Sequence, residues 1–514
     1  MTRDNLIAFT IFAISTIGFF VWGFKYIPSH HFLLFAIATV FGIFMAFNIG
    51  GNDVANSFGT SVGAKTITIK QALIIAAIFE LSGAIFAGGQ VTDTIRKGIV
   101  QIPVNDFNPM LFVLVMMASL LSAGLWLLFA SKKGLPVSTT HSIVGGIVGS
   151  SLALGYMITN GDNVLGMVRW DKIGQIVASW IISPLLGGLL SYLIYSFIKK
   201  NILMPSKILT AKHERLKRHR KALKDAYRLS LKDKSHTEQI KELTKLAFID
   251  DDEEHLEKPS DYQKKLKEFK HKEKSLDTFA PLKKYVPIVG AFAASIIAGM
   301  LLFKGLKHLK INIGSIETIW VVFVIATCAY LASAAIIGIM AKNDVNKATM
   351  RIFSWFQIFT ASAFAFSHGA NDIANAIGPF AAILDVLKTG AINAKAPVPM
   401  IAMVTFGISL VVGLWFLGRE VIQTVGTRLA EILPVTGFAA ELGASAVILL
   451  ATKMGIPVSS THILIGAVLG IGILNKDANW KLMKPIAMAW VITLPIAAIS
   501  SAIIFIVLKV IMGL

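Results

Sequence analysis

Apolar runs long enough to cross a bilayer recur along almost the whole chain. A run of about 18 residues or more with few charges predicts a transmembrane helix. The candidate spans lie near residues 5–24, 32–50, 70–88, 109–130, 141–159, 172–198, 285–303, 317–340, 352–368, 398–417, 437–452, 462–474 and 485–511. Some are short enough to be half-helices, so we expect about twelve complete spans. The runs do not alternate apolar with polar residues, as a transmembrane β-barrel requires. The pattern therefore predicts an all-α polytopic membrane protein.

The composition agrees with this interpretation. Of the 514 residues, 55% are hydrophobic and 15% are charged, whereas a soluble domain carries about 25% charged residues. The formal net charge of +19 lies mostly in loops, so membrane topology explains it better than a nucleic-acid partner. The single cysteine, Cys328, excludes an internal disulfide. The first run resembles a signal peptide but has a weak basic segment and no clear cleavage site, so we interpret it as the first transmembrane helix.

One charged segment, residues 199–284, interrupts the apolar pattern. It contains basic, helix-rich stretches and the acidic stretch IDDDEEHLEKPS. Basic pairs at its two ends, Lys199–Lys200 and Lys283–Lys284, place it in the cytoplasm, because the cytoplasmic ends of spans favour Lys and Arg. We interpret the segment as a solvated linker between two membrane halves, residues 1–198 with the leading helix and residues 285–514. A membrane-surface or regulatory element is the alternative.

Two motifs occur twice in the same order. The first pair is GGNDVANSFGT and GANDIANAIGP, and the second pair is ASKKGLPVSTTHSIVGGIVGSSL and ATKMGIPVSSTHILIGAVLGIGI. The step from Asp53 to Asp372 is 319 residues, and the step from His141 to His462 is 321 residues. Two unrelated motifs repeated at nearly one offset indicate that the whole membrane domain is duplicated.

The span count predicts how the two copies are oriented. Seven helical pieces separate the two Asn-Asp motifs, and an odd number places the motifs on opposite faces of the membrane. Glycines at Gly50, Gly51 and Gly369 allow the helix to break there. Inverted repeats with broken helices and polar residues near the midplane are typical of secondary transporters. We therefore expect two inverted repeats with broken or re-entrant helices.

The Asn-Asp motifs have the chemistry of a cation site. A carboxylate at membrane depth costs about 2.5–3.5 kcal/mol, so an ionisable residue there is a functional candidate. Carboxylate and amide oxygens, together with carbonyls freed at a helix break, suit a hard cation. The candidate ligands of Na⁺ or H⁺ are Asn52, Asp53, Asn56, Asn371, Asp372 and Asn375. The alternative is a pair of capping clusters that end helices.

The second motif pair has the chemistry of an anion site. Pro136 and Pro457 stop the preceding element, and Ser138 and Ser459 are placed to cap the helix that follows. The unpaired N–H groups and positive dipole of a helix N-terminus attract anions. The hydroxyls beyond the caps would be surplus if capping were their only task. The candidate anion ligands are Ser138, Thr139, Thr140, Ser459, Ser460 and Thr461.

The remaining polar residues in apolar runs have less specific roles. Glu80 and Glu441 lie inside apolar runs, are not repeat mates by sequence offset, and each require a partner in the helix bundle. His141 and His462 repeat, and we expect hydrogen-bonded structural histidines rather than metal ligands or proton relays. Three further histidines have no spacing typical of a zinc site: His30, His31 and His368.

The charge balance favours an anion carried together with a cation. Hydroxyls and helix N-termini suit an anion, whereas up to four nearby carboxylates repel it. A bound cation or proton removes that conflict. No P-loop, HExxH motif or clustered His–Asp metal ligands occur in the spans, so the sequence gives no support for an enzyme.

The quoted motifs identify a resemblance. The chain resembles the inorganic phosphate transporters (PiT) through GGNDVANSFGT, SHGANDIANAIGP, GLPVSTTH and GIPVSSTH, over both membrane halves but not the charged linker. The resemblance implies a multi-pass secondary transporter of the plasma or bacterial inner membrane. It would import orthophosphate with Na⁺ or H⁺ and need no cofactor. It also implies that the Asn-Asp motifs hold the cation, that the Ser/Thr loops hold phosphate, and that Glu80 and Glu441 are essential. One departure is Gly51, where the second copy has Ala370.

Several alternatives stay open at this point. The same architecture could carry another tetrahedral oxyanion such as sulfate, and a duplicated filter could form an anion channel. A membrane enzyme acting on phosphate esters is the least supported reading. The sequence does not distinguish Na⁺ from H⁺ coupling, leaves a homodimer open, and gives no reason to expect a nucleic-acid partner.

Overall fold

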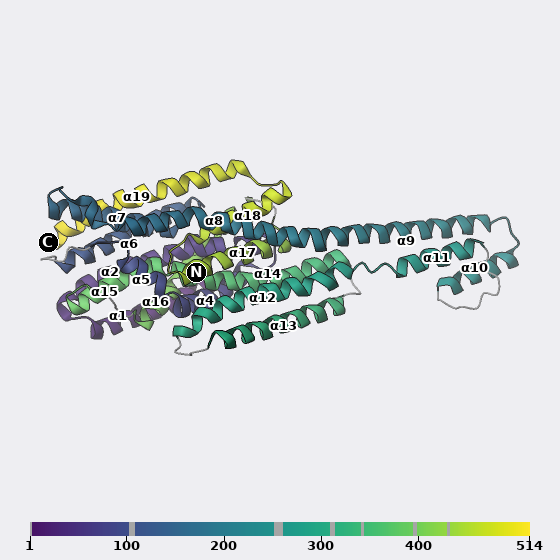
Figure 1. The fold of residues 1–514 in the computed structure, drawn as a ribbon, viewed down its shortest axis with the longest axis horizontal. Helices are drawn as coiled ribbons and strands as arrows, with labels where there is room; N and C mark the ends of the chain where they lie inside the picture. Colours follow the sequence, from purple (N-terminus) through teal and green to yellow (C-terminus); the bar gives the residue numbers. More distant parts are fainter. Residues whose placement is uncertain are drawn as a thin grey trace. The chain divides into compact units, whose positions relative to one another are not determined.

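The protein is described by a computed structural model over residues 3–101, 108–250, 261–308, 314–340, 344–393, 398–428 and 432–514. Apart from one antiparallel bridge between Val100 and Val168, these residues form helices, turns and connecting segments (Figure 1). Eleven of the described helices are long and apolar enough to cross a membrane, and α18 is a shorter apolar helix. The predicted all-α polytopic membrane protein is confirmed.

The helices fall into two membrane sets and a charged set between them. The first set is α1 (Arg3–Tyr26), α2 (Phe32–Ile49), α3 (Ala55–Gly63), α4 (Ile69–Ala87), α5 (Gly89–Lys97), α6 (Pro109–Lys132), α7 (Thr139–Thr159) and α8 (Trp170–Ile198). The charged set is α9 (Met204–Ser230), α10 (His236–Asp250) and α11 (Asp261–Lys274). The last set is α12 (Ala280–His308), α13 (Ser315–Met340), α14 (Val345–Asp372), α15 (Ala374–Thr389), α16 (Met400–Arg428), α17 (Pro434–Lys453), α18 (Ser460–Asn475) and α19 (Trp480–Met512).

Both Asn-Asp motifs lie where a membrane helix is interrupted. In the first copy a π-helical turn, η2 (Gly50–Val54), joins α2 to α3. In the second copy α14 ends at Asp372, and α15 begins at Ala374. The candidate spans between the two interruptions are α4, α6, α7, α8, α12 and α13. An even number of crossings makes α2 and α14 run in opposite directions, as inverted repeats require.

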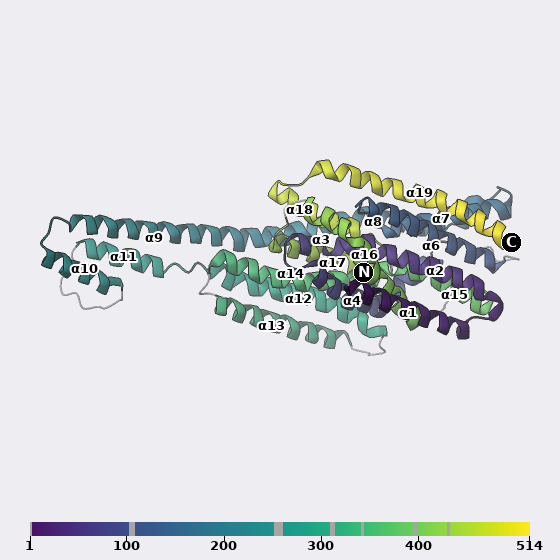
Figure 2. The same ribbon diagram turned by 180° about the vertical axis from the view of Figure 1, so that it is seen from behind.

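The chain divides into two compact units. The first contains Met1–Ser196, Phe292–Ala326 and Met350–Leu514, and the second contains Phe197–Ala291 and Thr327–Thr349. In the second unit α9 and α11 lie side by side in both views (Figures 1 and 2). The Tyr262 hydroxyl donates to the Leu223 carbonyl over 2.7 Å, and the Tyr262 ring stacks on Tyr227. Burial, together with the hydrogen bond to Glu242, raises the pKa of Tyr227 to about 12. Residues 251–260, which hold most of the acidic stretch, lie outside the described residues.

Glycines allow helices of different repeats to pack backbone against backbone. A Cβ atom on Gly50 would lie 1.8 Å from the Leu410 carbonyl oxygen, so the π-helical turn η2 at the end of α2 touches α16 directly. A Cβ atom on Gly369 would lie 2.1 Å from the Glu80 carbonyl oxygen, so α14 touches α4 in the same way. Gly369 therefore serves close packing inside α14, and the helix break that we predicted there occurs at Ile373 instead.

A second pair of glycines makes the same kind of backbone contact between the two repeats. A Cβ atom on Gly413 would lie 1.8 Å from the Phe47 carbonyl oxygen, and one on Gly83 would lie 2.0 Å from that of Phe366. Each repeat thus inserts its broken helix against a helix of the other repeat. This packing brings the two Asn-Asp motifs into one buried region.

Candidate functional site

The two Ser/Thr loops have the same local structure. Each follows a glycine in the left-handed region, Gly134 with φ of 64° and Gly455 with φ of 68°, where side chains are disfavoured. The His141 N–H donates to the Ser138 hydroxyl over 3.1 Å, and Ser138 thereby caps α7. Ser459 caps α18 through the equivalent bond from the next helix. The predicted caps are confirmed.

The first Asn of each motif fixes its own loop. The Asn52 amide donates to the Ser131 hydroxyl and to the Leu135 carbonyl, and its oxygen accepts from the Val137 N–H over 3.1 Å. Asn371 makes the equivalent three bonds, to Thr452, Ile456 and Val458. Both side chains are buried, and their amide oxygens are already used to hold a loop. Asn52 and Asn371 therefore each position the loop of their own repeat.

Asp53 accepts hydrogen bonds from both loops. The Thr139 hydroxyl donates to Asp53 Oδ2 over 2.5 Å, and the Thr139 N–H lies 3.4 Å from the same oxygen. The Thr461 hydroxyl, from the other repeat, donates to Asp53 Oδ1 over 2.5 Å. Asp372 accepts from the Ser460 hydroxyl of its own repeat. Asp53 is therefore one of the residues that join the two repeats at this site, and it is the carboxylate that binds hydroxyls of both loops.

Two acceptor oxygens at the same place have no hydrogen-bond partner among the described residues. They are Asp372 Oδ1 and Asn375 Oδ1, and Glu80 Oε1, beyond His368, is a further buried acceptor without a partner. The Asn375 amide donates to the Thr139 and Thr140 hydroxyls over 3.1 and 3.2 Å, which leaves its oxygen as an acceptor. A buried acceptor without a donor is costly unless something else satisfies it. The Asn56 side chain, the counterpart of Asn375, lies outside the described residues.

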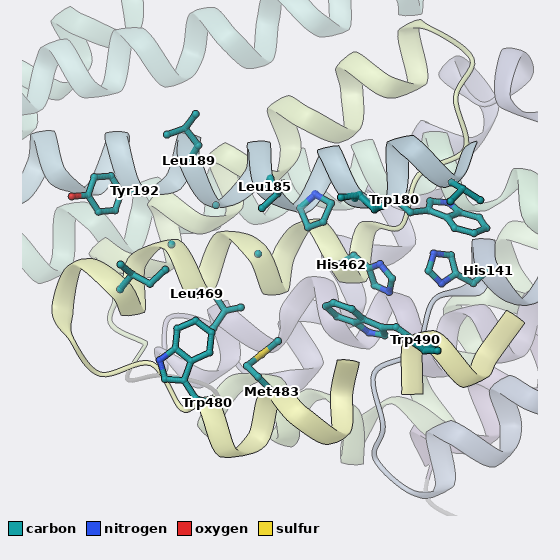
Figure 3. A pocket seen from close by; sticks show the side chains of 18 of the residues that line it. His141, Trp180, Leu185, Leu189, Tyr192, His462, Leu469, Trp480, Met483 and Trp490 are labelled. Carbon is teal, nitrogen blue, oxygen red and sulfur yellow. The ribbon is translucent and has the colours of Figure 1, made fainter. Parts of the chain in front are cut away.

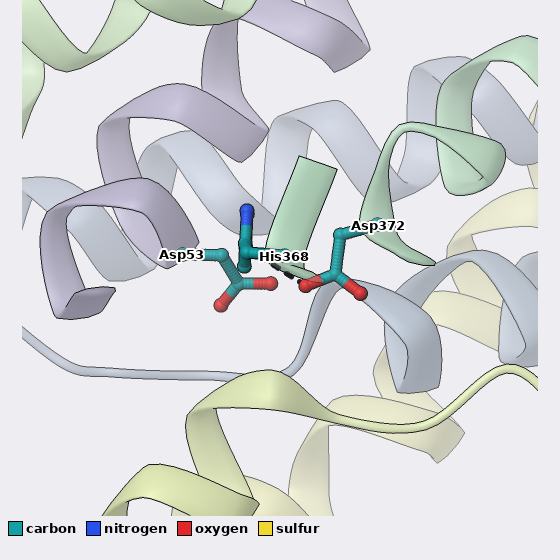
Figure 4. A group of neighbouring side chains, drawn as sticks. All are labelled: Asp53, His368 and Asp372. Carbon is teal, nitrogen blue, oxygen red and sulfur yellow. Dashed lines mark ion pairs between the residues drawn. The ribbon is translucent and has the colours of Figure 1, made fainter. Parts of the chain in front are cut away.

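The two Asp residues meet despite 319 residues of separation. Asp53, His368 and Asp372 are all buried, and one ligand atom from each lies within 4.8 Å of the others (Figure 4). Figure 4 shows the Asp53 and Asp372 side chains on either side of His368. The geometry brings together the residues that the sequence nominated and adds a histidine that it did not.

His368 was missed because its spacing was tested only for zinc. Its Nδ1 lies 2.8 Å from Glu80 Oε2, and its Nε2 lies 2.8 Å from Asp372 Oδ2. All three side chains are buried. Two signals could have found it. His368 lies four residues before Asp372, on the same helical face, and Glu80 needed a partner within the bundle.

Glu441 has a different kind of partner set. Its Oε1 accepts from the hydroxyls of Thr60 and Ser61 over 2.7 and 2.5 Å and lies 3.3 Å from the Gln357 amide. Its Oε2 accepts from the Thr360 hydroxyl over 2.8 Å. Four neutral donors thus stabilise one buried carboxylate, without a basic group among them. The predicted need for a partner is met at both glutamates, by a histidine at Glu80 and by hydroxyls at Glu441.

The loop hydroxyls that we expected to be surplus all have partners. Ser138 and Ser459 cap helices, and the hydroxyls that reach a carboxylate are those of Thr139, Ser460 and Thr461. The Thr140 hydroxyl donates to the Val458 carbonyl of the other repeat over 2.8 Å. An anion that uses these hydroxyls must therefore redirect them from the carboxylates or from Val458.

The repeated histidines lie behind the loops, next to an apolar cavity. The His141 ring packs against Trp180 and the His462 ring against Trp490 in tilted contacts, each at 3.7 Å between centroids. The two imidazoles lie 4.5 Å apart. A cavity of about 930 Å³ reaches them between α8, α18 and α19, with mostly aliphatic and aromatic side chains around it (Figure 3). Its lining offers few donors for a phosphate, and the ring contacts favour a structural role for His141 and His462. The hydrogen bonds that we predicted for them are not found, because both ring nitrogens of His141 and Nε2 of His462 have no hydrogen-bond partner among the described residues. Aromatic packing holds these rings instead.

Comparison with known proteins agrees with this geometry. Residues 49–501 match the phosphate transporter family. A protein of Mycobacterium bovis, named as a predicted phosphate permease, is 51% identical over 490 residues, which cover 94% of this chain and 88% of that protein. A chloroplastic inorganic phosphate transporter of Arabidopsis thaliana is 33% identical over 479 residues, which cover 91% of this chain and 70% of that protein.

A solved structure shares the fold. The structure titled "The sodium-dependent phosphate transporter" superposes with a TM-score of 0.71 at 29% sequence identity. The match covers 93% of this chain and all of that one. The family match spans the two Asn-Asp motifs, both Ser/Thr loops and both buried glutamates. The chain belongs to the phosphate transporter family.

Proposed function

We propose that the protein imports inorganic phosphate by symport with Na⁺, and that the cation binds between Asp53 and Asp372. Two buried acceptor oxygens carry this proposal, Asp372 Oδ1 and Asn375 Oδ1. Neither receives a hydrogen bond from the described residues, and they belong to the site where the Asp53 and Asp372 carboxylates meet. Hard cations prefer such oxygen ligands. A bound Na⁺ would satisfy both orphaned oxygens and offset the repulsion between Asp53 and Asp372.

Phosphate is proposed to bind between the N-termini of α7 and α18. Both helix starts present backbone N–H groups and a positive dipole end, and each carries capping and hydroxyl residues. The hydroxyls of Thr139, Ser460 and Thr461 would turn from the carboxylates toward the phosphate oxygens. Because Na⁺ then offsets part of the negative charge of Asp53 and Asp372, binding of the cation favours binding of the anion, which is the basis of coupled transport.

Three contacts join the repeats across this site and would open and close during transport. They are Thr461 to Asp53, Asn375 to the Thr139 and Thr140 hydroxyls taken together, and Thr140 to the Val458 carbonyl. Alternating access proceeds by one repeat rocking against the other around a central site. Breaking these contacts would release the loops on one side at a time. We place the linker of residues 199–284 on the cytoplasmic side, so phosphate would enter from the opposite side.

Proton coupling is the second candidate, and one observation favours it. The buried row Glu80–His368–Asp372 has the composition of a proton relay in membrane transporters. The solved neighbour with 29% identity is titled as sodium-dependent, which favours Na⁺. We therefore propose Na⁺ as the coupling ion, and uptake under separate Na⁺ and pH gradients distinguishes it from H⁺.

The test is uptake of labelled phosphate into proteoliposomes under separate gradients. We expect accumulation above the external concentration with an inward Na⁺ gradient at equal pH, and none with a pH gradient in K⁺. Accumulation with the pH gradient alone would replace Na⁺ by H⁺. Equilibration without accumulation under either gradient would indicate an anion channel. Excess sulfate serves as the control for selectivity, and strong competition by sulfate would contradict a phosphate-specific site.

Ser138→Ala and Ser459→Ala are expected to weaken phosphate binding. Each removes a donor to the anion, worth about 1.5–3 kcal/mol for a charged group, and a helix cap worth about 0.5–2 kcal/mol of stability. The apparent phosphate affinity should fall by about tenfold to a hundredfold. Ser150→Ala is the matched control, because Ser150 is a buried serine of α7 that bonds the Gly146 carbonyl away from the loop. Unchanged affinity in both loop variants would exclude their hydroxyls from the phosphate site.

A further inference from the structure

A second cavity, with a more polar lining, lies beside the turn that leads into the α18 loop. It has a volume of about 460 Å³ and is formed by three segments of the chain. These are the second half of α5 with Asp93 and Thr94, the start of α8, and the turn Met454–Pro457. The Thr94 hydroxyl donates to the Gly455 carbonyl over 2.7 Å and so ties α5 to that turn. Ser459 follows Pro457 by two residues, so the cavity adjoins the proposed phosphate loop of the second repeat.

Two basic side chains set the charge of this cavity. Arg169 and Lys172 line it together with Gln175. The guanidinium of Arg169 has no ion-pair or hydrogen-bond partner among the described residues, and Lys172 Nζ reaches only Gln175 Oε1, at 3.4 Å. The one carboxylate in the lining, Asp93, lies 3.2 Å from the buried guanidinium of Arg96. The cavity therefore carries uncompensated positive charge.

The fold holds Arg169 in place at the rim. The Arg169 N–H donates to the Ile99 carbonyl over 2.9 Å, next to the bridge between Val100 and Val168. The side chain itself is exposed. A fixed backbone with an exposed, unpaired guanidinium is suited to capture an oxyanion, because the planar fork donates two parallel bonds to it.

Neither the repeat nor membrane topology accounts for these charges. Trp170 and Trp480 begin equivalent helices, and by this alignment Asn479 replaces Arg169 and Leu482 replaces Lys172, whereas the lysines of α19, Lys481 and Lys484, replace Asp171 and Gly174. The other end of α8 leads into the charged linker, which we place in the cytoplasm, so Arg169 and Lys172 lie at the outer end of the helix. Basic residues are disfavoured at that end by the positive-inside rule, which points to another role for them.

We infer that this cavity is a first binding site for phosphate, where Arg169 and Lys172 capture the anion before it reaches the Ser459 loop. This inference rests on the proposed phosphate transport and adds to it an outer recruiting site. Clefts lined by one sign of charge raise the local concentration of an oppositely charged ligand and its rate of association. A site of this kind lowers the KM for phosphate without taking part in coupling.

The test measures initial rates of phosphate uptake in proteoliposomes of the full-length protein. In the double variant Arg169→Gln/Lys172→Gln we expect the KM to rise about tenfold at low ionic strength, the lower end of the range that charge focusing gives, with the maximum rate unchanged. Choline chloride added at constant Na⁺ should bring the variant and wild-type KM values together, because salt screens exposed charges. Lys388→Gln is the matched control, since Lys388 lies over the Tyr26 ring and not in this cavity.

A charge-rescue arm separates charge from structure. Arg169→Cys is made in a Cys328→Ala background, because Cys328 is the only native cysteine and is exposed. A membrane-impermeant thiol reagent that carries a quaternary ammonium should restore the low KM when added outside intact cells, and a neutral reagent of the same size should not. Equal effects of the two reagents would overturn the inference, as would a wild-type KM in the double variant.

The same chemistry would also bind the phosphate of a lipid headgroup. Uptake is therefore measured in vesicles with and without anionic phosphatidylglycerol. A KM effect of the double variant in both vesicles supports free phosphate as the ligand, whereas an effect confined to the anionic vesicles overturns it in favour of lipid. Absence of phosphate transport by the wild-type protein would instead refute the proposed function, so the two failures are distinguishable.

Discussion

Asp53→Asn is expected to abolish accumulation of phosphate driven by a Na⁺ gradient, while the folded protein stays in the membrane. The substitution keeps the size of the side chain and removes the charge that attracts the cation. It also weakens the bonds from Thr139 and Thr461, and a hydrogen bond to a charged group is worth about 1.5–3 kcal/mol. The measurement is labelled phosphate inside proteoliposomes at steady state. Asp372→Asn should have the same result.

The control for Asp53→Asn is Asp162→Asn, which changes an exposed Asp outside the site. It should accumulate phosphate as the wild-type protein does. Size-exclusion profiles in detergent separate loss of coupling from loss of folding. Accumulation at the wild-type level by both Asp53→Asn and Asp372→Asn would show that the coupling ion binds elsewhere. The two orphaned oxygens of Asp372 and Asn375 would then need another ligand.

The Asn-Asp motifs and Ser/Thr loops could be found from the sequence because they are duplicated. Each copy uses the same contacts, such as those by which Asn52 and Asn371 hold their loops. The same contacts require the same amino acids at equivalent positions. The spans could be found because hydrocarbon demands long apolar helices. What repeats in the structure therefore repeats in the sequence.

The Glu80–His368 pair could not be found in this way because it breaks the symmetry. The glycine contacts make Leu410 the structural counterpart of Glu80, since both carbonyls meet the equivalent glycines Gly369 and Gly50. The motif offset makes Ile49 the counterpart of His368. An ion pair in one half is thus an apolar pair in the other. A comparison of the sequence with itself has no signal for such a pair.

Glu441 shows the same asymmetry from the other half. By the loop offset its counterpart is Leu120, and the motif offset makes Pro379 and Phe380 the counterparts of Thr60 and Ser61. The hydroxyl donors of Glu441 come from α3 and α14, which are distant in sequence from α17. Only the packed bundle shows that they converge. The protein therefore combines a symmetric central site with two carboxylates that each belong to one half.

His368→Ala is expected to destabilise the protein strongly as well as to stop transport. Removing His368 leaves Glu80 and Asp372 buried without the group that bridges them. Loss of one partner of a buried ion pair costs about 3–5 kcal/mol, because the remaining charge cannot be solvated. The free energy of unfolding is measured in detergent by tryptophan fluorescence against denaturant. His30→Ala, at an exposed histidine outside the site, is the control and should unfold as the wild-type protein does.

A double-mutant cycle with Glu80→Gln tests whether the cost comes from the pair. Glutamine keeps the shape of Glu80 and removes the negative charge with which His368 pairs. The double variant Glu80→Gln/His368→Ala should therefore be more stable than the sum of the two single effects predicts. Residues in direct contact couple by about 0.5–3 kcal/mol, and we expect a value in the upper half of that range for a fully buried pair. Strictly additive effects, with His368→Ala close to wild type in stability, would mean that Glu80 is satisfied without His368. Glu80 would then be neutral in the folded protein. His368 would not be held as a cation between Glu80 and Asp372, and it would not fix the position of the Asp372 carboxylate at the cation site.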